Sequence, residues 1–233
     1  MAADIYPFPT TSTATRPTLV HPDAPQVKVK RMAWSEANSE AIDAIAKHPT
    51  VYPTMAHDST PPVDVFTLDH LLANPDNYFL GVYVDDSLVG FWMMLSRTEQ
   101  VVESHTFLLE SARGHVATVA LPQALKYIFT STPCMMLVGE VPACAPAARQ
   151  VAVWAGFKSA HVKKGAWLKD GQSHDLDIMY LGILDWFFKG LTGDTIMRAK
   201  TLISLLAIRG WMGKAAHLHT FFTATLGDLT GGA

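Results

Sequence analysis

Cysteine and charge are both scarce in this sequence. The 233 residues include two cysteines, and charged residues make up 17%. Cys134 and Cys144 flank one predicted strand, and a strand rises about 3.3 Å per residue, so its two ends lie too far apart for a disulfide. We therefore expect reduced, buried cysteines, as in an intracellular protein. A net charge of −3 gives no general basic surface, so no nucleic-acid partner is predicted.

Long hydrophobic runs are missing as well. The most apolar late segment, residues 201–208, is bounded by Lys200 and Arg209 and is far shorter than the ~20 residues that a membrane span needs. Residues 1–9 have neither a basic start nor an apolar run. The sequence therefore predicts no transmembrane helix and no signal peptide.

What the chain does have is hydrophobic residues, at 49%, which is enough for a substantial core. Prolines interrupt residues 1–25, which we interpret as an extended arm. Residues 26–182 have the organisation of one domain. From residue 183 the pattern changes to an apolar, helical extension that ends at residue 233.

The order of predicted elements indicates the fold class. Hydrophobic periodicity and turn residues predict a central mixed, mostly antiparallel sheet flanked by helices. Pro122 lies within one predicted helix, so we expect a kink or a break there. The expected strands are 26–33, 78–84, 88–95, 101–109, 134–141, 161–167 and 175–181, and the expected helices are 35–47, 67–73, 114–130, 146–155, 195–208 and a weaker segment, 217–226.

Three short motifs relate this order of elements to a known protein family. Arg113-Gly114 leads from a strand into a helix, Val141-Pro142 ends the next strand, and a further helix closes on Gly156-Phe157. Over residues 26–182 the chain resembles the GNAT superfamily of N-acetyltransferases. That resemblance implies acetyl-CoA as cofactor, with its pyrophosphate at the start of the helix. The cofactor-binding candidates it implies are Arg113, Gly114, His115 and Ala117.

Several positions depart from the pattern of that family. Val116 falls where the loop has its central glycine, and we expect the valine side chain to occupy space that diphosphate oxygens need. Thr118 falls where the last small residue belongs. Ala152 stands where many members have the tyrosine that protonates the departing thiolate, and Ala145 stands where they often have an asparagine that contacts pantetheine. Neither alanine can donate a hydrogen bond from its side chain.

Other residues are candidates for the chemistry itself. Glu103 and His105 alternate along a strand and so face one side, where a base for an amine nucleophile is chemically useful. Tyr180 on the last strand is a candidate acid in place of the missing tyrosine. The alternatives are a solvent-facing polar pair and an ordinary core tyrosine. His217 and His219 are the closest histidine pair, but no cysteine or carboxylate cluster accompanies them, so no metal site is predicted.

The C-terminal extension has two interpretations. One is a helix that packs on the domain or on a partner subunit, and the other is an interfacial membrane helix. We favour protein packing because the basic residues do not form one polar face. The apolar residues concerned are Trp186, Phe187, Phe188, Leu191, Ile196, Leu202, Ile203, Leu206 and Trp211, and the interleaved basic residues are Lys189, Arg198, Lys200, Arg209 and Lys214.

Two functional hypotheses follow. The first is a structural or assembly protein built on a degenerate acetyltransferase-like domain. With His105-Thr106 and Val141-Pro142, the domain resembles virion proteins of tailed bacteriophages, which implies a capsid, portal, tail or internal ejection component in the virion or host cytoplasm. It would bind other subunits through residues 1–30 and 183–233 and would need no cofactor. The second is an active acetyl-CoA-dependent N-acetyltransferase. The departures at the cofactor and acid positions favour the first.

Overall fold

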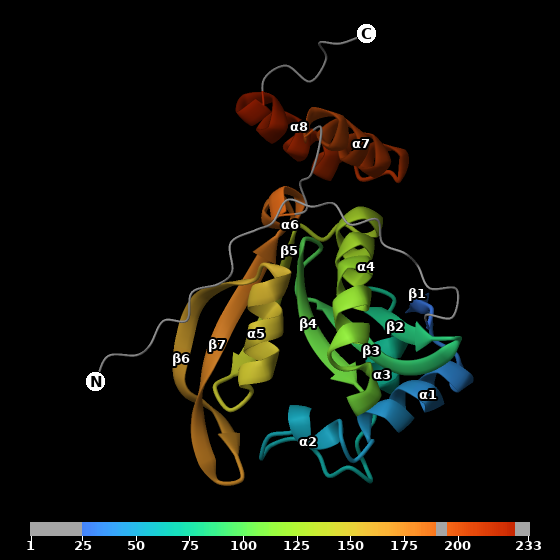
Figure 1. The fold of residues 1–233 in the computed structure, drawn as a ribbon, viewed down its shortest axis with the longest axis vertical. Coiled ribbons are helices and arrows are strands. Elements are labelled where there is room, and N and C mark those ends of the chain that lie inside the picture. Colours follow the sequence, from blue (N-terminus) through green and yellow to red (C-terminus); the bar gives the residue numbers. More distant parts are fainter. Residues whose placement is uncertain (1–24, 190–194, 227–233) are drawn as a thin grey trace.

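The computed structural model describes residues 25–189 and 195–226, and these contain one seven-stranded sheet (Figure 1). The strand order is β1-β2-β3-β4-β5-β7-β6, and all neighbours are antiparallel except β4 and β5. The predicted α/β class with a mostly antiparallel sheet is therefore confirmed. The strands are β1 (Val27–Met32), β2 (Tyr78–Val84), β3 (Ser87–Ser96), β4 (Val101–Leu108), β5 (Met136–Pro142), β6 (Lys158–Lys169) and β7 (Gln172–Gly182).

Helices cover both faces of the sheet. Two of them, in the proline-rich loop and directly after β7, were not expected from the sequence. The helices are α1 (Glu36–Ala46), α2 (Tyr52–Met55), α3 (Asp69–Ala73), α4 (His115–Ser131), α5 (Pro146–Ala155), α6 (Ile183–Lys189), α7 (Thr195–Ile208) and α8 (Met212–Leu226), with a 3-10 turn at Glu110–Ala112. Asp194 directly precedes α7 and is a candidate cap by residue type, but it and the predicted arm 1–25, apart from residue 25, lie outside the described residues.

Both tight turns of the sheet have the backbone that their sequences predict. Asp85 and Asp86 join β2 to β3 with φ of 47° and 66°, and Asp170 and Gly171 join β6 to β7 with φ of 52° and 71°. A two-residue turn with positive φ matches the twist of the flanking strands, and Asp and Gly tolerate it best. These turns set the register next to each turn, and both hairpins shift register further along their strands.

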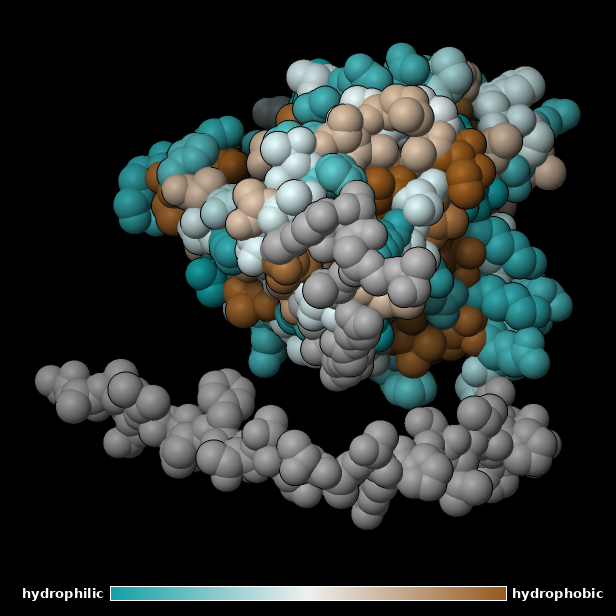
Figure 2. All heavy atoms as spheres, turned by 90° about the horizontal axis from the view of Figure 1, so that it is seen from above, coloured by the Kyte–Doolittle hydropathy of each residue, from teal (hydrophilic) through white to brown (hydrophobic). Residues whose placement is uncertain are grey.

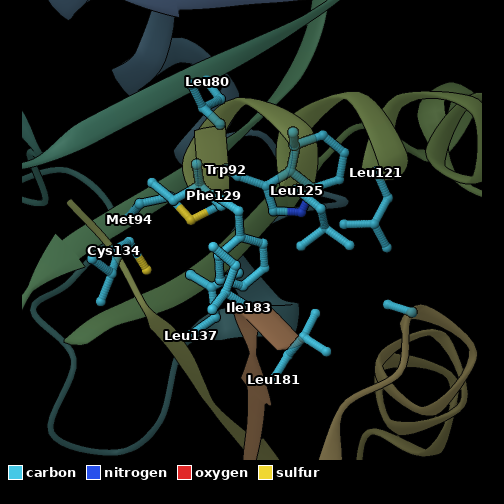
Figure 3. Close-up of a cluster of buried hydrophobic side chains, with 14 of the residues drawn as sticks. Leu80, Trp92, Met94, Leu121, Leu125, Phe129, Cys134, Leu137, Leu181 and Ile183 are labelled. Atoms are coloured by element: carbon cyan, nitrogen blue, oxygen red, sulfur yellow. The ribbon is translucent and has the colours of Figure 1, made fainter. Parts of the chain in front are cut away.

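The sheet separates two hydrophobic cores. On one face, side chains of β2 and β3 such as Leu80, Trp92 and Met94 pack against Leu125 and Phe129 of α4 (Figure 3). On the other face, α1 and α3 cover a row of aromatic rings across β2, β3 and β4, in which Phe91 and Phe107 stack at 4.6 Å. Both faces of β2 and β3 are therefore covered, whereas Ser104, His105 and Thr106 in the middle of β4 are not fully buried.

Helix α4 runs through Pro122 as one helix from His115 to Ser131. The break that the proline made plausible is not found, because buried residues on either side, including Leu121 and Leu125, hold both halves against the core. The neighbouring Gln123 adds a link to the sheet edge: its side-chain amide accepts from the N–H of Val29 at 3.2 Å and donates to the carbonyl of Val27 at 3.1 Å.

The C-terminal helices close the far end of α4. The buried ammonium of Lys214 donates to the carbonyls of Phe129 at 2.9 Å, of Thr132 at 3.1 Å and of Cys134. The guanidinium of Arg209 donates to the carbonyl of Thr130 and to the hydroxyl of Ser131. The last carbonyls of a helix have no intrahelical donor and carry partial negative charge, so these cations satisfy them.

Helices α7 and α8 thus pack on the domain itself, as the packing interpretation expects. Phe222 of α8 is buried, with its ring centroid 4.8 Å from that of Phe187 in α6. Figure 2 looks down on this end of the molecule and shows hydrophobic patches there; Leu205, Ile208 and Met212 are exposed on these helices. No helix among the described residues is long and apolar enough to cross a membrane.

We expect Lys214→Met to lower the free energy of unfolding by about 2 kcal/mol, because it leaves buried carbonyls without a donor. Burial lowers the pKa of Lys214 to about 8, so the ammonium still prevails at neutral pH. Urea unfolding at pH 7 measures the change. Lys126→Met, at an exposed lysine of α4, is the control and should change the midpoint little; equal midpoints for the two variants would contradict the role of Lys214.

Candidate functional site

The parallel strands β4 and β5 stop pairing in the middle of the sheet. Their register consists of Val101 with Met136, Val102 with Leu137 and Glu103 with Val138, although β4 continues to Leu108 and β5 to Pro142. Beyond Glu103, the side of β4 that faces β5 therefore has no strand partner. Figure 1 shows α4 and α5 on the same face of the sheet, on either side of β4. An extended ligand can bond to backbone groups that a strand leaves unpaired in this way.

Helix α4 begins beside this opening, and no side chain caps it. Gly114 is the N-cap residue, with φ of 69° and ψ of −119°, a conformation that only glycine adopts readily. The N–H of Thr118 bonds back along the chain and donates to the carbonyl of Gly114 at 3.0 Å. The earlier N–H groups of the first turn point out of the helix, and the first turn holds no acidic residue to neutralise its partial positive charge.

Space in front of this helix start is open. Apart from Gly114 and its two chain neighbours, no heavy atom lies within 4 Å of the position that a Cβ on Gly114 would take. Val116 is partly buried and packs against the core on the α4 face of the sheet. The expectation that its side chain occupies space needed by diphosphate oxygens stays a prediction. The backbone without a Cβ at this helix start lies at Gly114.

The other predicted cofactor residues surround the same turn in different ways. Arg113 is exposed, but its guanidinium is held by the carbonyls of Thr50 and Leu108, the latter at 3.3 Å. His115 is exposed at the helix start. Ala117 is buried in the core, so only its backbone can serve a ligand. The structure thus brings these residues together at one helix end, where backbone N–H groups are the available donors.

Glu103 and His105 face the same side of β4, and they contact each other. Oε1 of Glu103 lies 2.9 Å from Nε2 of His105, and Oε2 accepts from Nε of Arg97 at 2.5 Å. Glu103 is 6% exposed. The bond to His105 and then the Arg97 guanidinium lower the pKa of the Glu103 carboxyl to about 2, against the opposing effect of burial. Sequence reasoning found Glu103 and His105 but missed Arg97, which lies in the loop between β3 and β4.

Tyr180 lies on the same row of the sheet but not in contact with this pair. Glu103 is in register with Val138, and Val138 with Tyr180, so the three side chains share one face. The two strand spacings place Glu103 and Tyr180 about 10 Å apart. No hydrogen bond joins Tyr180 to Glu103 or His105 within the described part of the chain. On α5, Ala145 is the N-cap residue and Ala152 is half-buried.

A loop contact that no sequence pattern suggested borders this region. The carboxylate of Asp58 accepts from the N–H groups of Asp170 at 2.8 Å and Gly171 at 3.0 Å, and the ring of His57 meets that of Trp167 edge-on at 4.8 Å. The loop after α2 is thereby fixed to the tip of the β6–β7 hairpin. A separation of more than 100 residues explains why local reading of the sequence could not find it.

Outside this region, the described residues form surface hollows but no metal-binding cluster. No group of three or more His, Cys, Asp or Glu side chains among residues 25–189 and 195–226 could hold a metal ion. Surface hollows of about 450 Å³ and about 190 Å³ are lined by other residues, the first by α8 and the second by segments that flank β1 and α3.

Comparison with known proteins identifies the fold. No protein-family model and no curated protein sequence matches the chain. Among solved structures, it is similar to a chimera of spermidine N-acetyltransferase SpeG from Vibrio cholerae and hSSAT, at 16% identity over 68% of this chain and 97% of that chain, with a TM-score of 0.57. The Vibrio cholerae spermidine N-acetyltransferase in complex with CoA and spermine is 14% identical over 68% and 97% of the two chains, with a TM-score of 0.55.

A putative acetyltransferase from Acinetobacter baylyi is also similar, at 18% identity over 68% of this chain and 93% of that chain, with a TM-score of 0.56. Identities at this level show the fold alone. The chain has the fold of the GNAT acetyltransferases, as the resemblance in its motifs implied.

The ion pairs of Glu103 predict a defined pH dependence of stability. Because the folded-state pKa is about 2 and the ordinary value is 4.5, the carboxylate stabilises the fold above pH 4.5 and loses this effect as the pH falls toward 2. We expect wild type to exceed Glu103→Gln in free energy of unfolding by roughly 2 kcal/mol at pH 6, with the difference shrinking between pH 4.5 and 2.5.

Urea unfolding at a series of pH values measures this difference. Glu99→Gln is the matched control and should show no such trend. Glu99 is exposed in the loop between β3 and β4, which also holds Arg97. A difference between wild type and Glu103→Gln that stays constant from pH 6 to 2.5 would refute the ion-pair assignment.

Proposed function

We propose that the protein is an acyl-CoA-dependent acyltransferase, in its simplest form an acetyl-CoA-dependent N-acetyltransferase. The observation that supports this best is the uncapped start of α4 beside the opening between β4 and β5, with Glu103 and His105 at the edge of that opening. A helix start with open space in front of it is suited to a diphosphate. A strand edge without a partner is suited to the extended pantetheine arm.

The residues present fit the cofactor in these respects. The backbone N–H groups at His115, Val116 and Ala117 would hold the diphosphate, and the bare main chain at Gly114 would let it approach. When bound, acetyl-CoA would supply the thioester whose acyl group is transferred. The side-chain contact that Ala145 cannot make stays unreplaced.

The departing sulfur does not require the tyrosine that Ala152 replaces. A thiol has an ordinary pKa near 8.5, so a thiolate is a stable leaving group in comparison with an alkoxide. A dedicated acid therefore contributes less here than the base that deprotonates an amine, whose ordinary pKa is about 10. The similar structures carry spermidine in their names, which makes a polyamine the first acceptor to test.

The virion role receives no support from the described residues. The arm assigned to it falls almost entirely outside them, and the basic residues Arg209 and Lys214 of the C-terminal extension serve the domain's own α4. Attachment to other subunits through residues 1–30 and 183–233 stays a prediction from sequence.

Calorimetry with acetyl-CoA tests the cofactor site. We expect wild type to bind with a micromolar dissociation constant and Gly114→Val to weaken binding at least ~10-fold, because the added side chain meets the diphosphate and strains the backbone. Gly210→Val is the matched control: Gly210 also has positive φ, at 82°, with open space around it, but lies between α7 and α8. No heat with folded wild type, or equal weakening in the two variants, would refute the site.

A further inference from the structure

We propose that Nδ1 of His105 is the atom that accepts the proton from the acceptor amine, and that Glu103 and Arg97 are positioning residues for that ring. The inference rests on the proposed acyltransferase function and assigns distinct roles to residues that the sequence presents as equivalent candidates.

Both oxygens of Glu103 are already engaged. Oε1 lies 2.9 Å from Nε2 of His105, and Oε2 receives Nε and Nη2 of Arg97. The side chain is 8% exposed, so neither oxygen presents a free face to a ligand. The low pKa of the carboxyl, about 2, also makes it a weak base at neutral pH, because a useful base has a pKa near the working pH.

The ring of His105, unlike the carboxylate of Glu103, keeps one polar atom available to a ligand. Its side chain is 36% exposed, yet Nε2 is inaccessible to solvent and lies 2.9 Å from Oε1 of Glu103, in an ion-pair contact that lacks hydrogen-bond geometry. A carboxylate this close repels a nitrogen lone pair, so the neutral ring carries its hydrogen on Nε2, which leaves the lone pair on Nδ1. Nδ1 has no hydrogen bond to any described residue. A buried carboxylate thus fixes the tautomer, and the other nitrogen of the ring is free to act.

The position of the ring on β4 matches this role. His105 comes two residues after Glu103, the last residue that pairs with β5, and so lies in the first unpaired part of the strand. Its neighbour in register on the other side is Met93 of β3, which is buried. A group held here is adjacent to the opening where the thioester would be placed.

The proton and electron balance of the step is simple. His105 takes one proton from the ammonium form of the acceptor through Nδ1 and releases it to solvent after turnover. The amine nitrogen then forms a bond to the thioester carbonyl carbon, and the C–S bond breaks with its electron pair on sulfur. The second amine proton passes to sulfur, so that the products are an amide and the free thiol.

Nitrogen-15 NMR of the histidines tests the arrangement without any substrate. We expect the His105 ring, assigned by the signal that His105→Gln removes, to be the Nε2–H tautomer once it is neutral. The Nδ1–H tautomer would overturn the proposal, since the lone pair would then face Glu103.

Kinetics test the roles, with acetyl-CoA and a panel of primary amines that contains spermidine, lysine and a short peptide with a free N-terminus. We expect His105→Gln, which can still donate to Glu103, to lower kcat by about 10²- to 10⁴-fold with the KM for acetyl-CoA within about threefold of wild type. Glu103→Gln should lower kcat less, by roughly 10-fold, because the base itself is retained. His70→Gln, at an exposed histidine of α3, is the control.

The outcomes distinguish failure of the assignment of His105 as the base from failure of the cofactor site. A larger loss in Glu103→Gln than in His105→Gln would make Glu103 the base and overturn this assignment. Acetyl-CoA binding without transfer to any amine of the panel would overturn it too, while leaving the cofactor site in place. Absence of acetyl-CoA binding by wild type would refute the proposed function and this inference together.

Discussion

The rest of the site depends on the early end of pairing between β4 and β5. Antiparallel neighbours hold both strands on their outer sides, β3 along β4 and β7 along β5, so the opening cannot close by a shift of either strand. The paired residues Val102 and Leu137 are buried in the core. An opening defined by backbone register depends little on which side chains surround it.

The two ends of helix α4 differ in whether their unpaired backbone groups have hydrogen-bond partners. At its C-terminal end, Lys214 and Arg209 from the appended helices supply donors to the last carbonyls. At its N-terminal end, Gly114 provides no cap and the N–H groups are left to solvent or a ligand. Unsatisfied helix ends are unfavourable when buried, but this one faces open space. The difference leaves the positive end of the dipole available beside the opening.

Sequence reasoning succeeded where one residue type has one structural use. Asp85-Asp86 and Gly156 marked a turn and a helix end correctly, because few residues adopt positive φ. Tertiary contacts decide what local pattern does not: α4 continues through Pro122 between buried neighbours, and Lys214, one of the basic residues interleaved with apolar ones, is 5% exposed. For the site, alternation along a strand placed Glu103 and His105 on one face, but neither their direct contact nor the part of Arg97 follows from spacing.

The departures from the family pattern are weaker evidence against cofactor binding once the atoms that bind a diphosphate are considered. Those atoms are backbone N–H groups, and every residue except proline has one, so under the proposed function His115, Val116 and Ala117 would serve as well as glycines. The decisive side-chain requirement is the absence of a Cβ on the approach, and Gly114 meets it with a conformation that other residues avoid. Under the proposed function, positions 116 and 118 need no glycine, because the glycine that matters stands where the chain turns into the helix.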